Sequence, residues 1–161
     1  MDFVKINLDA SFHANSSQGG WGAIARDSDG DVAVATAGAL TRLSSALHAE
    51  AMALLKAIGV VVQSGMGKVI FETDCLQLQQ ALVSTTMDRG QLGVLFREAK
   101  YQLNLEFIEY KVVYCPRGCN KPAHVLAALD CPGFMISHMV WESELPPDVS
   151  RAVTPDLVGP E

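Results

Sequence analysis

Apolar and polar side chains alternate along the first forty residues, and turn signals interrupt the pattern. In the first segment the alternation places two sets of side chains on opposite faces of a strand: Val4, Ile6 and Leu8 against Lys5, Asn7 and Asp9. A polar turn at 15–20 leads to a second strand at 21–26, and Asp29-Gly30 marks a tight hairpin before a third strand at 31–40. The pattern therefore predicts three antiparallel strands.

The spacing of apolar residues then changes to that of a helix. Ser44 and Ser45 are candidate N-caps, and Gly65 and Gly67 end the segment. The apolar side chains between them recur at helical intervals: Leu47, Ala51, Leu54, Ile58 and Val61. A short apolar strand at 68–73 follows.

The next part of the chain alternates helical and extended patterns. We expect helices at 74–83, 91–103 and 120–129, and a strand at 106–114. The order of elements is therefore βββαβααβα. Because strands joined through helices run parallel, the sequence predicts an α/β fold with a five-stranded mixed sheet, three antiparallel strands followed by two parallel ones, flanked by helices.

The length and composition are those of one compact domain. The chain has 161 residues and is 49% hydrophobic, which is enough to bury a core. We expect this domain at 1–131 and a Pro-containing C-terminal tail at 132–161 that is surface-packed or partly disordered. Without a long apolar run or the pattern of a signal peptide, we expect an intracellular protein of the nucleus or cytoplasm with no membrane partner.

Charge and cysteine content narrow the possible functions. A net charge of -6 disfavours nucleic-acid binding through bulk electrostatics, although carboxylates that bind divalent ions also contribute negative charge. The four cysteines are too few and too irregular for a disulfide framework. A zinc site at Cys115, Cys119, His124 and Cys131 is disfavoured by its spacing and by the helical pattern at 121–129. We interpret the cysteines as reduced thiols.

Three carboxylates lie where chemistry is possible, although each also has a structural interpretation. Asp9 is on the polar face of the first strand, where water could solvate it. Glu50 is at the edge of the apolar helix face, where it either snorkels to solvent or points at a partner. Asp74 closes the fourth strand, where it could cap the next helix. If the sheet is ordered as predicted, the three converge, and their mutual repulsion calls for cations such as Mg²⁺ or Mn²⁺.

Four segments, in order along the chain, resemble the ribonuclease H-like family: 6–11 (INLDAS), 48–54 (HAEAMAL), 71–75 (FETDC) and 117–127 (RGCNKPAHVLA). The resemblance covers residues 4 to about 130. It is closest to the "reverse transcriptase-like" branch of plant retroelements, whose ends the tail with Trp141 and Pro146-Pro147 also resembles.

The resemblance implies a site for two divalent metal ions, Mg²⁺ or Mn²⁺. Asp9 would bridge both ions, and Glu50 and Asp74 would complete the site of the ion near the leaving oxygen. His124 stands at the position of the family's fourth acidic residue and would be the remaining catalytic and metal-binding side chain. An imidazole suits Mn²⁺ better than Mg²⁺ and removes one negative charge. Its alternative interpretation is a partly exposed helix residue paired with Asn120.

The implied reaction is hydrolysis of the RNA strand of an RNA/DNA hybrid by a metal-dependent endonuclease, leaving 5′-phosphate and 3′-hydroxyl ends. Recognition would use the 2′-hydroxyls across a shallow minor groove. Candidate contacts are side chains of the first turn and of the last motif: Asn15, Ser16, Ser17, Gln18, Arg117 and Asn120. The loop at 114–119 lacks the histidine that aids product release in some relatives, and no basic extension is visible.

Two alternatives stay open. A domesticated and catalytically inactive domain could act as a nucleic-acid or protein interaction module, which would account for the acidic composition and for His124. The chain could also be a fragment of a larger polypeptide. Binding of divalent ions at Asp9, Glu50 and Asp74, measured as a gain in thermal stability, distinguishes the nuclease from the module.

Overall fold

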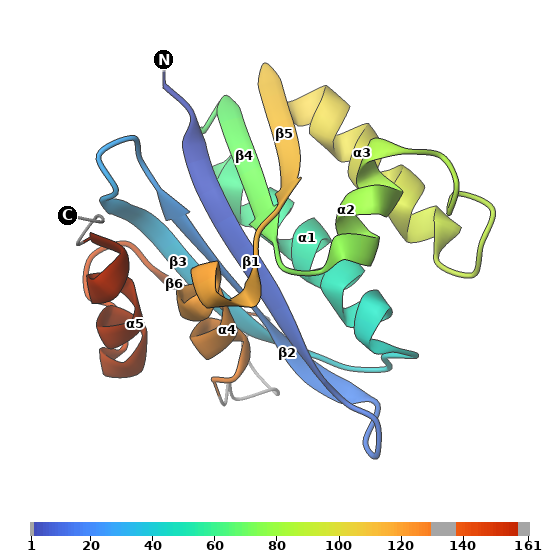
Figure 1. Cartoon of the computed structure of the whole chain (residues 1–161), viewed down its shortest axis with the longest axis horizontal. Coiled ribbons are helices and arrows are strands. Elements are labelled where there is room, and N and C mark those ends of the chain that lie inside the picture. Colours follow the sequence, from blue (N-terminus) through green and yellow to red (C-terminus); the bar gives the residue numbers. More distant parts are fainter. Residues whose placement is uncertain (1, 130–137, 158–161) are drawn as a thin grey trace.

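The computed structural model describes residues 2–129 and 138–157, with the side chains described as far as residue 153. A mixed sheet runs through the molecule in the order β5-β4-β1-β2-β3-β6 (Figure 1). Three strands form an antiparallel meander: β1 (Val4–His13), β2 (Gln18–Arg26) and β3 (Val32–Leu40). On the other side of β1, β4 (Lys68–Thr73) and β5 (Glu109–Tyr114) pair in parallel. The expected three antiparallel and two parallel strands are confirmed.

A sixth strand corrects the expectation of a five-stranded sheet. Strand β6 (Met139–Trp141) lies in the Pro-containing tail and pairs antiparallel with Ala35–Ala37 of β3. Helix α5 (Pro147–Leu157) follows it and buries Val149 and Val153. A strand of three residues is too short for its side-chain alternation to be recognised. The segments of the tail at 132–137 and 158–161 lie outside the described residues.

Helices cover both faces of the sheet (Figure 1). Three pack against the larger core: α1 (Ala46–Gln63), α2 (Leu76–Val83) and α3 (Gly93–Glu106). Helix α4 (Lys121–Ala127), which follows the short 3₁₀ helix η1 (Arg117–Cys119), and α5 pack against the opposite face. Because side chains alternate along a strand, β1 presents Ile6 and Leu8 to the larger core and Asn7 and Asp9 to the side of α4.

Helix α1 is long and apolar enough to cross a membrane by length and composition alone. Its position explains that composition, because eight of its residues, including Leu54, Ile58 and Val61, are buried in the core of the domain. The Ser45 hydroxyl caps the helix by accepting a hydrogen bond from the backbone amide of His48 at 3.0 Å. The predicted N-cap is thus confirmed, and α1 is a core helix.

Several element boundaries differ from the predicted ones. The polar turn expected at 15–20 is shorter, because β1 and β2 continue to pair as far as His13 and Gln18. The backbone of Ser17 takes a left-handed conformation, with φ of 54°. Helix α3 continues to Glu106, so that the strand expected from that residue begins at Glu109. Backbone pairing and helix continuation override the local side-chain pattern at these ends.

Glycines in β2 let α4 lie directly on the sheet. A Cβ atom at Gly22 would meet the Cβ of Leu126 and would lie 2.7 Å from the backbone nitrogen of Ala127. A Cβ atom at Gly20 would meet the carbonyl oxygen of Ala127. These contacts fix α4 over β1 and β2, and they set the height of every side chain that α4 carries.

We expect Gly22→Ala to destabilise the protein by about 1–3 kcal/mol, because the methyl group collides with the backbone of α4, which cannot move without opening the core. Urea unfolding measures the difference. Gly59→Ala is the matched control, since nothing lies within 4 Å of its added Cβ on the exposed side of α1, and we expect it to stabilise by about 0.5–1 kcal/mol. Equal unfolding midpoints for the two variants would contradict the close packing of α4.

Candidate metal centre

The parallel pairing of β1 and β4 brings two of the predicted carboxylates side by side. The last paired residues are Leu8 and Thr73, and Asp9 and Asp74 are the next residue of each strand. Because β4 ends there, the edge of β1 beside Asp9 is no longer covered by a strand. Asp9 is nearly buried, with 4% of its surface exposed, and it lies at this uncovered edge of β1 close to Asp74.

Glu50 completes a three-carboxylate cluster from the first turns of α1. One carboxylate oxygen from each of Asp9, Glu50 and Asp74 lies within 4.8 Å of the other two. Glu50 Oε2 and Asp74 Oδ2 are buried and have no hydrogen-bond partner. Buried polar atoms are almost always paired, so these two oxygens are available to an ordered water or a cation.

Burial and mutual repulsion disfavour ionisation within the cluster. Burial, the charge of Asp9, a hydrogen bond to Asp9 and the charge of Asp74 together raise the pKa of Glu50 to about 9. Burial and the charge of Asp9 also raise the pKa of Asp74, and the neighbouring Arg117 and His124 oppose this shift. A divalent cation would reverse both shifts by stabilising the ionised forms.

Glu50 and Asp74 do not play the purely structural roles that the sequence also allowed. Glu50 does not snorkel, because its Oε2 atom is buried. Asp74 does not cap α2, whose N-cap residue is Cys75 without a side-chain capping bond. The guanidinium of Arg117 lies 3.6 Å from Asp74 Oδ2 and is 85% exposed, so a cation stands at the solvent side of the cluster.

The direct side-chain contact of His124 with the cluster is to Asp9. Its Nδ1 atom is 2.9 Å from Asp9 Oδ2, and 58% of its side chain is exposed. It does not belong to the group of ligand atoms formed by the three carboxylates. The expected pairing with Asn120 is limited to the backbone, where the amide of His124 donates to the carbonyl oxygen of Asn120.

A buried polar network, which the sequence did not reveal, lies beside the cluster. Asn7 Nδ2 donates to Glu72 Oε2 at 3.0 Å and to Asn120 Oδ1 at 3.1 Å, and Arg26 donates to Asn7 Oδ1 at 3.2 Å. The shared face of Asn7 and Asp9 was the available signal, but it does not identify partners that are 65 and 113 residues away. The network joins β1, β2, β4 and the start of α4.

Asn120 corrects one predicted substrate contact. Its side chain has no exposed surface, and Nδ2 donates to the carbonyl oxygen of Leu8 at 2.8 Å. A side chain whose amide is buried and bonded internally is not available to a nucleic acid. Asn120 instead fixes the start of α4 to β1, one residue before Asp9.

The other predicted contacts divide into two places. Arg117 lies at the cluster through its ion pair with Asp74. The four residues of the first turn are exposed at the tip of the β1–β2 hairpin: Asn15, Ser16, Ser17 and Gln18. The pair formed by His13 and Gln18 at this tip lies four residues along the strands from the pair formed by Asp9 and Gly22, which is about 13 Å. The structure therefore groups Arg117 with the carboxylates and leaves the hairpin tip apart.

The cysteines of the proposed zinc alternative are in different surroundings. Cys115 is buried, and burial raises the pKa of its thiol to about 12. Cys119 is exposed, and Cys131 lies outside the described residues. Over residues 2–129 and 138–153, the three carboxylates are the group of potential ligands that comes together.

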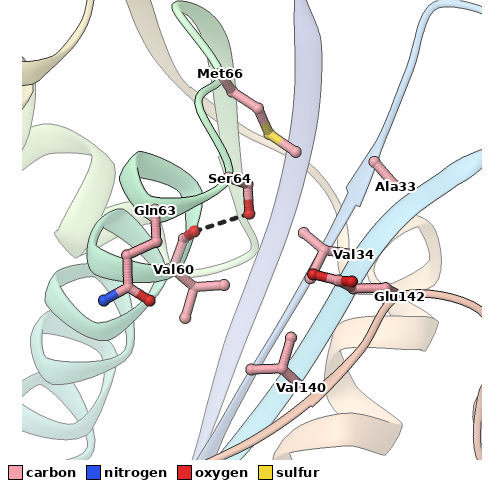
Figure 2. A pocket seen from close by; sticks show the side chains of 8 residues that line it. All are labelled: Ala33, Val34, Val60, Gln63, Ser64, Met66, Val140 and Glu142. Atoms are coloured by element: carbon pink, nitrogen blue, oxygen red, sulfur yellow. Dashed lines mark hydrogen bonds between the residues drawn. The ribbon is translucent and has the colours of Figure 1, made fainter.

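A separate hollow of about 480 Å³ lies between the end of α1 and strands β3 and β6 (Figure 2). Five of its eight lining residues are apolar, Gln63, Ser64 and Glu142 are polar, and Ser64 Oγ donates a hydrogen bond to the carbonyl oxygen of Val60. None of the clustered carboxylates lines it. The hollow is therefore not part of the candidate metal centre.

Solved structures with the same architecture include several ribonucleases H. An RNase H1 from the archaeon Halobacterium salinarum matches with a TM-score of 0.65 at 20% identity, covering 77% of this chain and 93% of that chain. An N-terminal RNase H domain from Mycobacterium tuberculosis matches with a TM-score of 0.69 at 22% identity, covering 79% and 91%. LC11-RNase H1, isolated from compost and solved in complex with an RNA/DNA hybrid, matches with a TM-score of 0.67 at 19% identity, covering 76% and 92%.

The fold is thus that of the ribonuclease H-like proteins, and the acidic cluster is the feature on which a nuclease function could rest. The family described as "Reverse transcriptase-like" matches residues 7–129. The chain belongs to this family, as the resemblance of its four motifs indicated. No curated protein matches it.

Proposed function

We propose that the chain is a divalent-metal-dependent endonuclease of the ribonuclease H type, which hydrolyses the RNA strand of RNA/DNA hybrids. The observation that carries this proposal is the group of three carboxylate oxygens within 4.8 Å of one another, two of whose members have buried oxygens without a hydrogen-bond partner. Hard cations such as Mg²⁺ and Mn²⁺ prefer oxygen ligands, so the donor set fits such an ion.

The residues of the cluster have distinct proposed roles. Asp9, Glu50 and Asp74 would hold the metal, which would supply an activated water and neutralise the charge that develops on the phosphate. Arg117, exposed and next to Asp74, would bind a phosphate of the substrate backbone. Asn120 positions β1 and α4 relative to each other through its bond to the Leu8 carbonyl.

The balance of charge predicts weak binding of the hybrid. The chain carries 12 Lys and Arg against 18 Asp and Glu, and phosphate contacts normally supply most of the affinity for nucleic acids. The hybrid in the complex of LC11-RNase H1 supports this class of substrate. An origin in a plant retroelement and an intracellular location remain predictions.

A labelled RNA/DNA hybrid incubated with the protein in Mg²⁺ and, separately, in Mn²⁺ tests the proposal. We expect cleavage of the RNA strand with 5′-phosphate and 3′-hydroxyl ends, and no cleavage in EDTA. The same RNA as a single strand and in an RNA duplex serves as the control for substrate class. If the hybrid stays intact both in Mg²⁺ and in Mn²⁺, the proposed nuclease function is wrong.

The second candidate is a catalytically inactive interaction module. It is favoured by His124, which the resemblance places at the position of the family's fourth acidic residue, and by the net charge of -6. A module of this kind would bind its partner without any requirement for a divalent ion. Intact hybrid after incubation in both metals, together with unchanged thermal stability on adding either metal, would favour it.

A further inference from the structure

His124 is the side chain of α4 that contacts the carboxylate cluster. Helix α4 carries this side chain over β1, and Nδ1 forms a 2.9 Å contact with Asp9 Oδ2. If the carboxylate of Asp9 is ionised it can only accept a hydrogen bond, so the Nδ1 atom donates one. One lone-pair direction of the Asp9 oxygen is therefore used by a neighbouring side chain on the α4 side.

The remaining ligand atoms are arranged around one position. Asp9, Glu50 and Asp74 each offer an oxygen within 4.8 Å of the other two, and His124 is not part of that group. A ring nitrogen bonded to Asp9 would have to give up this bond to bind an ion there, and the other ring nitrogen lies on the far side of an imidazole that is 58% exposed. An imidazole is moreover a poor ligand for Mg²⁺.

Formal charge also favours one divalent ion over two at this cluster. Three ionised carboxylates carry a charge of -3, so one divalent ion leaves -1 and a second would leave +1. Arg117, 3.6 Å from Asp74, already adds a cation at the solvent side of the cluster. A fourth carboxylate in place of His124 would let two divalent ions balance four negative charges. The side chains present balance one ion better than two.

We infer that this cluster binds a single divalent ion, and that His124 is a hydrogen-bonding partner of Asp9 at the place where a second ion would otherwise be held. The inference rests on the proposed function, because it concerns the same metal centre. His124 is thereby a positioning residue that orients Asp9, and the residue at 124 determines how many ions the site takes.

Replacement of His124 by Asp tests the inference directly. Residue 124 is largely exposed on α4, so the substitution should leave the fold intact, which circular dichroism verifies. Titration with Mn²⁺ alone, followed by calorimetry and by the electron paramagnetic resonance of free Mn²⁺, should give one bound equivalent in the natural chain and two in His124→Asp. His124→Asn, which is neutral, is the matched control and should keep one equivalent. Each titration is repeated with a 2′-O-methyl RNA/DNA hybrid present to supply phosphates.

The outcomes separate this inference from the proposed function. Two equivalents in the natural chain, falling to one in His124→Asn, would overturn the single-ion site and leave the metal-dependent nuclease in place. One equivalent in all three proteins, with and without the hybrid, would overturn residue 124 as the determinant. Absence of bound Mn²⁺ from the natural chain would overturn the metal centre, and with it the proposed function.

Discussion

Asp9→Asn is expected to reduce hybrid cleavage by about a hundred- to a thousand-fold or to below detection. Asp9 is the central member of the cluster. It is hydrogen-bonded to His124 and lies next to the carboxylates of Glu50 and Asp74. The substitution keeps the size of the side chain but removes the charge that a metal ion needs. Initial rates of cleavage of a labelled hybrid in Mg²⁺ and in Mn²⁺ measure the effect.

Asp29→Asn is the matched control for this loss. Asp29 is an exposed residue of the hairpin between β2 and β3, so the same change of charge should leave the rate within about a factor of two, as the weak effect of exposed charges suggests. Thermal unfolding in EDTA shows whether Asp9→Asn remains folded. If the variant is folded and keeps a tenth or more of the original rate, Asp9 is not a metal ligand in catalysis.

The order of elements as far as α4 could be predicted because each element carries its own periodicity. Strand β1 alternates between two buried faces, and α1 repeats its apolar positions at helical intervals. Strand β6 could not be predicted in this way, because its three residues are held by pairing with β3 rather than by their own pattern. An element can be predicted from its own pattern only if it is long enough for that pattern to repeat, and β6 is not.

The candidate site was predictable as a set of carboxylates but not as a geometry. The predicted strand order already placed Asp9, Glu50 and Asp74 near one another. In the structure, one carboxylate oxygen of each lies within 4.8 Å of the other two. The contact of His124 with Asp9 depends on the height of α4 above the sheet, which the packing of Gly22 sets. That height is a property of tertiary packing and has no counterpart in local sequence.

Asn120 shows how a motif residue can be misinterpreted. Its position in the last motif and its polar side chain suggested a contact with nucleic acid, but it is buried and bonded to the Leu8 carbonyl and to Asn7. A buried backbone carbonyl requires a donor, and the amide of Asn120 supplies it. From sequence alone, a polar residue needed by the backbone is indistinguishable from one that faces a ligand.

The metal-free protein is expected to lose stability as the pH rises through the neutral range. The pKa of Glu50 is about 9 in the folded chain, against an ordinary value of 4.5, so the folded state holds a proton that the unfolded state has released. The free energy of unfolding should therefore fall between pH 4.5 and 9 by up to about 1.4 kcal/mol per pH unit. The raised pKa of Asp74 acts in the same direction. Urea unfolding in EDTA at pH 5.5 and 8 measures this loss.

Glu50→Gln should remove most of this pH dependence, because its neutral amide has no proton to release. Glu106→Gln, at the exposed end of α3, is the matched control and should keep the slope of the natural chain. Mn²⁺ binds the ionised carboxylates, so adding it at pH 8 should restore stability to the natural chain, by about 2.7 kcal/mol at a hundred times the dissociation constant, but less to Glu50→Gln. Equal stability of the metal-free natural chain at pH 5.5 and 8 would show that Glu50 ionises as an ordinary carboxyl group, and the cluster would then have no stored repulsion for a cation to relieve.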